Sequence, residues 1–267
     1  RDGALAERLV VPERCLVEVP DRVSDERAVF AEPLAAALHV LDELEAAEAE
    51  GGRGPVVVLG DGKLGLLCAL ALRGAGVPVL LVGRHEAKLA HAAAAGAEVV
   101  LESRLAERGA DGTAALVVEA TGSAGGLGVA LRLARPRATV VLKTTVAGAL
   151  EVDLSPVVIN ELRVVGSRCG DMGRAVGALA RGEVDPAPLV AARYPLARAA
   201  EALARAGERG VLKVLVDVAP LRGPSEREKR PSAAGSRCRA TWRLYAGGRT
   251  VEAAERGAVE VPGDVAP

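Results

Sequence analysis

The feature that most constrains the fold is a run of four apolar residues, Val56 to Leu59, followed directly by the glycine pattern G-x-G-x-x-G. Gly60 permits a tight turn after the strand, Gly62 lets a pyrophosphate approach the backbone closely, and Gly65 lets the next helix pack against the strand. An apolar helix is predicted to follow over residues 63–74. Strand, loop and helix in this order predict a dinucleotide-binding unit. The alternative is a tight turn that holds no ligand.

The start of that helix is an expected binding surface. Its first turn carries Lys63 and Leu64. The free backbone N–H groups and the partial positive charge of a helix N-terminus favour phosphate binding. We therefore expect both residues to lie at the pyrophosphate of a bound dinucleotide, together with the three glycines of the loop.

Apolar strands and helices alternate after the glycine loop. Strands are predicted over residues 77–82, 99–100, 116–119, 139–142 and 162–169, and helices over 86–95 and 127–134. Near-continuous apolar strands separated by helices are typical of a parallel sheet covered on both faces. The predicted fold class is therefore α/β, with a Rossmann doubly wound parallel sheet.

The flanking segments are predicted from weaker patterns. Two short strands are expected within residues 2–19, a helix after Ser24, and a long helix over 34–50, with Pro33 in or near a local break. Later helices are predicted over 174–181 and 196–206, and a last strand over 211–218. From about residue 220 the chain is rich in Arg, Gly, Pro, Ser and Glu without sustained periodicity, which predicts a disordered tail.

The end of the second predicted strand indicates which dinucleotide is bound. An NAD site usually has an acid there, which binds the 2′-hydroxyl of the adenosine ribose. This chain has Gly83 at that position, which is expected to leave room for a 2′-phosphate, and the planar cation Arg84 follows. Lys88 adds positive charge, and His85 can donate a hydrogen bond. We therefore expect NADP in preference to NAD. The alternative is that Arg84 is an exposed turn residue.

Composition and charge argue against several other classes of function. The formal net charge is -1, so the chain has no electrostatic footprint for nucleic acid or an anionic membrane. Its apolar runs are short and broken, so no transmembrane span is expected. The chain opens without Met or a secretory signal, which suggests a fragment. Cysteines outside any C-x-x-C spacing indicate buried or incidental thiols in a reducing cytoplasm: Cys15, Cys68, Cys169 and Cys238.

Several ordered motifs match the pattern of one family. Residues 2–12 contain D-G-A-L-A-E and then L-V-V-P, residues 31–39 contain A-E-P-L and then His39, residues 119–122 read E-A-T-G, and residues 166–168 read G-S-R. Over residues 2–218 the chain resembles the medium-chain dehydrogenase/reductase family, the zinc-dependent alcohol dehydrogenase-like proteins. These motifs are specific to the family and not to a substrate.

The resemblance implies a GroES-like catalytic domain, made from both ends of the chain, around the Rossmann domain. Residues 1–50 would be a remnant of the catalytic domain with a linking helix, 51–172 the Rossmann domain, 173–219 the return to the catalytic domain, and 220–267 the tail. The Cys and the His-Glu pair that hold zinc in the family are not in this sequence. We therefore expect an N-terminally truncated chain with a partial catalytic domain.

For the metal, the resemblance singles out Glu32. In the polyol dehydrogenase branch the Glu of E-P-L faces the zinc, so Glu32 would be both a metal ligand and a catalytic residue. One carboxylate cannot hold zinc, because a site needs about three protein ligands. The alternative is a capping or salt-bridging carboxylate at a helix start. His39 is expected to be a packed or hydrogen-bonded helix residue.

For the cofactor, the resemblance implies further contacts. Thr121 and Gly122 would lie beside the adenosine ribose, and Thr144 and Thr145 would lie near the nicotinamide ribose. Lys213 would reach toward the pyrophosphate, and the alternative is a surface lysine on an edge strand.

Three functions are compatible with these patterns. The first is an oxidoreductase that passes a hydride between a nicotinamide cofactor, NADP favoured, and a small alcohol, polyol or matching carbonyl, with zinc polarising the alcohol oxygen. The second is an NADP(H)-binding module without catalysis, because the zinc ligands are absent. The third is a zinc-free reductase of the same superfamily. The expected partners are the small-molecule substrate and further copies of the chain, without nucleic acid or membrane.

Overall fold

The computed structural model describes residues 11–12, 15–146, 149, 151–218, 241–244 and 249–252. The strands expected within residues 2–19 lie partly outside these described residues, and so does most of the tail predicted to be disordered. The chain divides into two compact units, one of residues 30–189 and one of residues 1–29 with 190–267. Each unit is described by itself below.

The larger unit is built on a six-stranded sheet with the strand order β3-β2-β1-β4-β5-β6. All neighbouring strands pair in parallel, so the predicted Rossmann-type sheet is confirmed. Apolar residues fill both faces of the central strands, since β1 and β4 are buried throughout. The strands are β1 (Val56–Leu59), β2 (Val79–Gly83), β3 (Glu98–Leu101), β4 (Ala114–Glu119), β5 (Ala134–Leu142) and β6 (Arg163–Gly166).

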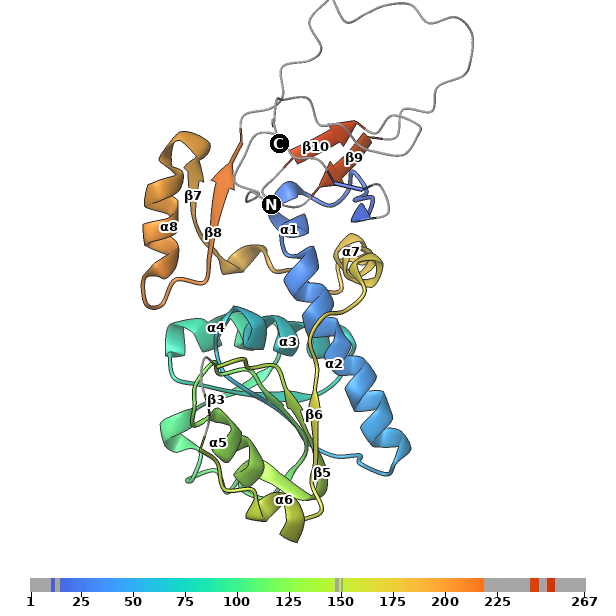
Figure 1. Ribbon diagram of the computed structural model, residues 1–267, viewed down its shortest axis with the longest axis vertical. Helices are drawn as coiled ribbons and strands as arrows, with labels where there is room; N and C mark the ends of the chain where they lie inside the picture. The colour runs from blue at the N-terminus through green and yellow to red at the C-terminus, as the bar shows by residue number, and fades with distance from the viewer. Residues whose placement is uncertain are drawn as a thin grey trace, which may run out of the picture. The chain divides into compact units, whose positions relative to one another are not determined.

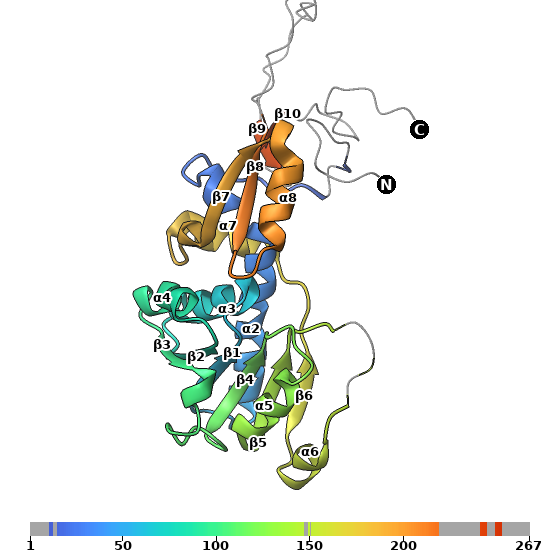
Figure 2. The ribbon, with the colours of Figure 1, turned by 90° about the vertical axis from the view of Figure 1, so that its left-hand side faces the viewer.

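Helices cover both faces of this sheet (Figure 1). On one face α2 (Ala31–Ala49), α3 (Lys63–Gly74) and α4 (Glu86–Ala94) pack on the sheet, and α2 contacts α3. Helix α7 (Met172–Arg181) packs on α2. On the other face α5 (Gly126–Leu133) packs on β4 and β5, and α6 (Ser155–Ile159) contacts α5 (Figure 2). None of the helices among the described residues is long and apolar enough to cross a membrane.

Helix α2 begins at Ala31, three residues before the predicted start at Leu34. Pro33 therefore lies inside the first helical turn and not in a break. Proline is tolerated there, because the N–H groups of the first turn have no partner within the helix. Glu32 lies in the same turn.

The smaller unit contains α1 (Asp25–Ala28), α8 (Ala199–Gly207) and two parallel strands, β7 (Val190–Pro195) and β8 (Lys213–Asp217). Strand β7 is absent from the prediction because its residues alternate between half-buried and exposed and include Arg193 and Pro195. Within the tail, β9 (Thr241–Leu244) pairs antiparallel with β10 (Arg249–Glu252). Neither of these two strands is predicted by the sequence patterns.

The compact units divide at residues 29/30 and 189/190, whereas the sequence analysis placed domain boundaries at 50/51 and 172/173. The difference arises because α2 and α7 pack on each other and α2 packs on α3. Helix α2, expected to link two domains, therefore groups with the Rossmann sheet. The assignment of the smaller unit to a GroES-like domain stays a prediction.

Candidate functional site

The order of the strands places a crevice at one edge of the sheet. Strand β1 lies between β2 and β4, so the chain runs outward in one direction from β1 to β3 and in the other direction from β4 to β6. Ligands of doubly wound sheets bind at the carboxyl ends of the strands where this reversal occurs. Gly60, Gly83, Ala120 and Lys143 lie at or directly after the carboxyl ends of β1, β2, β4 and β5. The loops predicted to bind the cofactor therefore meet at one edge.

The three glycines of the loop have different surroundings. Gly60 has φ +119°, and a Cβ on it would lie 2.5 Å from the carbonyl oxygen of Ala120. A Cβ on Gly65 would lie 1.9 Å from the carbonyl oxygen of Gly60. A Cβ on Gly62 would meet nothing within 4 Å. Gly60 and Gly65 are thus required by the packing of the protein itself, while Gly62 leaves open space on the ligand side.

The first turn of α3 faces this open space. Gly62 is the N-cap residue of α3 and provides no side-chain cap. Lys63 is exposed and Leu64 half-buried in the turn that follows. Uncapped N–H groups at a helix N-terminus are suited to bind an anion.

Asp61, which the sequence analysis did not single out, anchors the turn after β2. Its side chain is buried, and its Oδ2 accepts hydrogen bonds from the backbone N–H of Arg84 at 2.8 Å and of His85 at 2.7 Å. His85 Nδ1 lies 2.9 Å from the same oxygen. Burial acts to raise the pKa of Asp61, but the hydrogen bonds from His85 and from the two backbone N–H groups lower it below its ordinary value.

The space in front of Gly83 is filled by the protein itself, and the role of Gly83 beside a 2′-phosphate stays a prediction. A Cβ on Gly83 would lie 2.6 Å from Cβ and 2.8 Å from Oδ2 of Asp61, so the Asp61 side chain fills the space. Glycine is required here for close packing between the loop after β1 and the end of β2. The contact between Asp61 and Gly83 could not be inferred from the sequence, because the two residues become neighbours only when β1 and β2 pair.

Arg84, the predicted phosphate ligand, is held by an acid. Its Nε lies 2.5 Å from Oε2 of Glu102 and its Nη2 lies 3.3 Å from Oε1. Hydrogen bonding to Glu102 and the charge of that residue raise the pKa of Arg84. Lys88 is half-buried in α4. Glu102 follows β3 directly, and β3 lies next to β2. An acid in this position was the sequence signal that could have identified Glu102 as a partner of Arg84.

The loops after β4 and β5 are tied together. The Glu119 side chain is 2% exposed and accepts hydrogen bonds from the backbone N–H of Thr121 at 2.8 Å and from Thr121 Oγ1 at 2.6 Å. The backbone N–H of Gly122 donates to Thr144 Oγ1 at 3.0 Å. The structure thus brings together Thr121, Gly122 and Thr144, three of the residues predicted to lie beside the two riboses.

A buried lysine joins α2 to the carboxyl edge. Lys143 Nζ donates to the carbonyl oxygen of Ala36 at 2.6 Å and to Ser167 Oγ at 2.7 Å. Ser167 Oγ lies 3.2 Å from Nδ1 of His39, which agrees with the expected hydrogen-bonded role of that histidine. Burial lowers the pKa of Lys143. Lys143 is not among the site residues expected from the sequence.

The described residues do not form a zinc site. Among them, no group of three or more His, Cys, Asp or Glu side chains could hold a metal ion. Glu32 is exposed in the first turn of α2. Its role as a metal ligand or catalytic residue stays a prediction. Lys213 is the first residue of β8 in the smaller unit, and its role at the pyrophosphate also stays a prediction.

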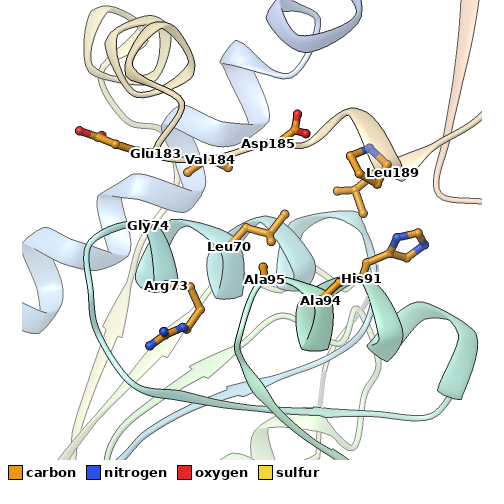
Figure 3. A pocket seen from close by; sticks show the side chains of 11 residues that line it. Leu70, Arg73, Gly74, His91, Ala94, Ala95, Glu183, Val184, Asp185 and Leu189 are labelled. Carbon is orange, nitrogen blue, oxygen red and sulfur yellow. The ribbon is translucent and has the colours of Figure 1, made fainter.

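A separate cavity of about 320 Å³ lies at the far ends of α3 and α4 (Figure 3). Its wall includes Leu70, Arg73, His91 and Leu189. These helices start at the carboxyl edge of the sheet and run back toward its amino edge, so this cavity lies away from the glycine loop. Arg73 donates to the carbonyl oxygen of Val77 at 3.1 Å. None of the predicted site residues lines this cavity.

Comparison with known proteins relates this arrangement to one group of enzymes. Residues 64–181 match the family model described as zinc-binding dehydrogenase. D-xylulose reductase A of Aspergillus oryzae is 28% identical over 208 residues, which are 71% of this chain and 56% of that protein. D-arabitol-phosphate dehydrogenase of Enterococcus avium is 24% identical over 233 residues, 82% of this chain and 65% of that protein. The chain therefore spans between about half and two thirds of these relatives.

Solved structures agree with the sequence matches. A zinc-binding dehydrogenase of Sinorhizobium meliloti, determined with NADP bound, aligns with a TM-score of 0.71 and 29% identity, covering 81% of this chain and 66% of that one. Galactitol-1-phosphate dehydrogenase of Escherichia coli aligns with a TM-score of 0.67 and 25% identity, and the alignment covers 80% of this chain and 66% of that one.

Proposed function

We propose a dehydrogenase function for this chain, which belongs to the medium-chain dehydrogenase/reductase family of zinc-type alcohol dehydrogenase-like proteins. The reaction would be hydride transfer between a nicotinamide dinucleotide and a small alcohol or the matching carbonyl. The observation that carries this proposal is the open space at Gly62, in front of the uncapped first turn of α3 and at the point where the strand order reverses. That space fits a pyrophosphate.

The proposed substrate class is polyols and their carbonyl counterparts. It is supported by the names of the relatives, which include a D-xylulose reductase, a D-arabitol-phosphate dehydrogenase and a galactitol-1-phosphate dehydrogenase. The proposed location is a reducing cytoplasm, which is supported by the free thiols of Cys15, Cys68 and Cys169.

The proposed cofactor is NADP, with NAD as the alternative. Arg84 and Lys88 supply positive charge after β2, and the related Sinorhizobium meliloti enzyme was solved with NADP. Another structural neighbour was solved with NADH. A bound nicotinamide supplies the chemistry of hydride transfer. The residues of this chain hold the cofactor: α3 faces the pyrophosphate, and Thr121, Gly122 and Thr144 form the adjoining wall.

Calorimetric titration of the folded chain with NADPH and with NADH tests this proposal. We expect tighter binding of NADPH, and we expect Arg84→Gln to weaken it by about 10- to 100-fold, because a charge-assisted hydrogen bond contributes about 1.5–3 kcal/mol. NADH binding should change by less than about twofold, since it has no 2′-phosphate for the guanidinium to bind.

Arg108→Gln is the matched control, since it removes an arginine that pairs with Glu98 at the start of β3, at the opposite end of that strand from the site. A folded chain that binds neither cofactor would contradict the proposal. Cofactor binding without turnover of polyols would support the second function, a binding module.

The chain is further proposed to form a homodimer through β6. This strand is at the edge of the sheet, and the neighbouring exposed apolar side chains are Leu154, Val158, Ile159 and Val164. An exposed edge with apolar residues is a template for pairing with another chain.

Light scattering should give a mass about twice the 27.2 kDa of one chain. The Ile159→Glu variant should have the mass of a single chain. Leu203→Glu, at an exposed leucine of α8, is the control. A monomeric mass for the unmodified chain at tens of micromolar would refute the dimer.

A further inference from the structure

We propose that Glu102 sets the preference between the two dinucleotides, because its carboxylate competes with the cofactor's 2′-phosphate for the guanidinium of Arg84. The inference rests on the proposed function, since it assumes that a dinucleotide occupies the crevice. It assigns a specificity-determining role to a residue outside the glycine loop and outside the turn after β2.

The first step is the geometry of two adjacent strand ends. Strands β2 and β3 pair in register, with Gly83 opposite Leu101. The residues that follow, Arg84 and Glu102, therefore leave the sheet side by side. A cavity of about 500 Å³ opens at this point, and Arg84, Leu101, Glu102 and Ser103 line it. The ion pair thus forms part of the wall of an open cavity at the carboxyl edge.

The second step is the way Arg84 is bound. Two of its nitrogens, Nε and Nη2, face the two carboxylate oxygens of Glu102. This is the same bidentate geometry with which a guanidinium binds a phosphate. A 2′-phosphate that uses this edge of Arg84 must displace Glu102. If the phosphate binds another edge, its two negative charges lie close to the carboxylate and are repelled by it.

The third step separates the roles of the two acids near Arg84. Asp61 is buried, and three hydrogen-bond contacts to Arg84 and His85 hold it in place, so it cannot move away when a ligand enters. The Glu102 side chain is 25% exposed and that of Arg84 is 62% exposed. Exchange of partners at an exposed ion pair requires only rotation of side chains. Glu102 is therefore the adjustable acid.

Glu102 could have the opposite role, that of orienting Arg84 for the phosphate. The two roles predict opposite changes in NADPH affinity when Glu102 is removed. If Glu102 only orients Arg84 for the phosphate, its removal weakens NADPH binding. If it competes with the phosphate, its removal strengthens NADPH binding. In both cases NADH, which carries no 2′-phosphate, is nearly unaffected. The sign of the change in NADPH affinity therefore distinguishes competition from orientation.

The experiment is calorimetric titration of the full chain and of Glu102→Gln with four probes: NADPH, NADH, adenosine 2′,5′-bisphosphate and adenosine 5′-monophosphate. We expect Glu102→Gln to tighten the binding of NADPH and of the bisphosphate by about three- to tenfold, because it removes one competing ion pair and one like-charge contact. NADH and the monophosphate should change by less than about twofold. Glu102→Ala should act in the same direction.

The matched control is Glu86→Gln. Glu86 is exposed in the first turn of α4 and forms no ion pair with a described residue, so this variant removes one negative charge near Arg84 without freeing it. In the double variant Arg84→Gln with Glu102→Gln, the gain for NADPH should disappear, since the group that Glu102 competes for is gone.

Two different failures can be told apart. If the chain binds NADH or NADPH but Glu102→Gln leaves their ratio unchanged, or weakens NADPH, the inference is overturned and the proposed function stands. If the folded chain binds none of the four probes, the proposed function fails and the inference fails with it. Circular dichroism melting of each variant establishes that it is folded.

Discussion

Gly65→Ala is expected to destabilise the larger unit by about 3 kcal/mol or more, because the new Cβ would lie 1.9 Å from the carbonyl oxygen of Gly60. The obstructing atom is backbone and cannot rotate away. Gly60 is itself closely packed, since a Cβ on it would lie 2.5 Å from the carbonyl oxygen of Ala120 after β4. Melting followed by circular dichroism should show a midpoint lower by roughly 10 °C. An unchanged midpoint would contradict the observed contact between the helix and the loop.

Gly62→Ala is the matched substitution in the same loop. Its Cβ would meet nothing within 4 Å, and the backbone at this position has φ -74°, which any residue adopts. The melting midpoint should therefore remain within about 2 °C of that of the unmodified chain. Cofactor binding should fall by about tenfold or more, because a methyl group would separate the pyrophosphate from the N–H groups of α3. Unchanged cofactor affinity would mean that the pyrophosphate does not lie in front of Gly62.

Glu119→Ala is expected to cost about 2–4 kcal/mol of unfolding free energy. The Glu119 side chain is almost fully buried and accepts hydrogen bonds from the backbone N–H and the hydroxyl of Thr121. Alanine would remove Oε1, which accepts both hydrogen bonds, and would leave a cavity beneath the loop after β4. Gly126 packs against the same carboxyl group, since a Cβ there would lie 2.4 Å from Oε1 of Glu119. The loop of Thr121 and Gly122 should also lose its order, so cofactor binding should weaken as well.

Glu119→Gln is the control for this prediction. The amide oxygen of glutamine can accept from Thr121 in the same position, so the cost should be below about 1.5 kcal/mol. Chemical denaturation of the two variants measures the difference. Equal costs for alanine and glutamine would show that the charge of Glu119, and not its hydrogen bonds to Thr121, stabilises the loop.

The elements around the glycine loop agree with their predicted bounds. Strand β1 and helix α3 begin and end at the predicted residues, because a short apolar run and a glycine turn define them locally. Strand β7 and helix α6 were not predicted. In both, the stabilising contacts come from distant segments: β7 pairs with β8, and α6 packs against α5. Local propensity is a weak guide for such elements.

The residues of the candidate site also fall into those that local sequence patterns identify and those that only tertiary contacts bring together. Gly60, Gly62 and Gly65 could be found from their spacing, because each performs its role within one turn of the chain. Asp61 and Glu102 are visible in the sequence, but the groups that they bind could not be assigned from it. Asp61 bonds to the backbone of residues 23 and 24 positions away, and Glu102 pairs with a residue 18 positions away. Only the pairing of β1, β2 and β3 brings these groups together.

By itself, the sequence determined the fold class, the position of the dinucleotide loop and the resemblance to a dehydrogenase family, since these follow from local patterns of apolar residues and glycines. Only the tertiary structure decided that Asp61 fills the space at Gly83 and that Glu102 binds Arg84. The physical reason is that the attraction between a carboxylate and a cation or an N–H group depends on the distance between them in space. In a parallel sheet, residues far apart along the chain reach that distance only after the strands have paired.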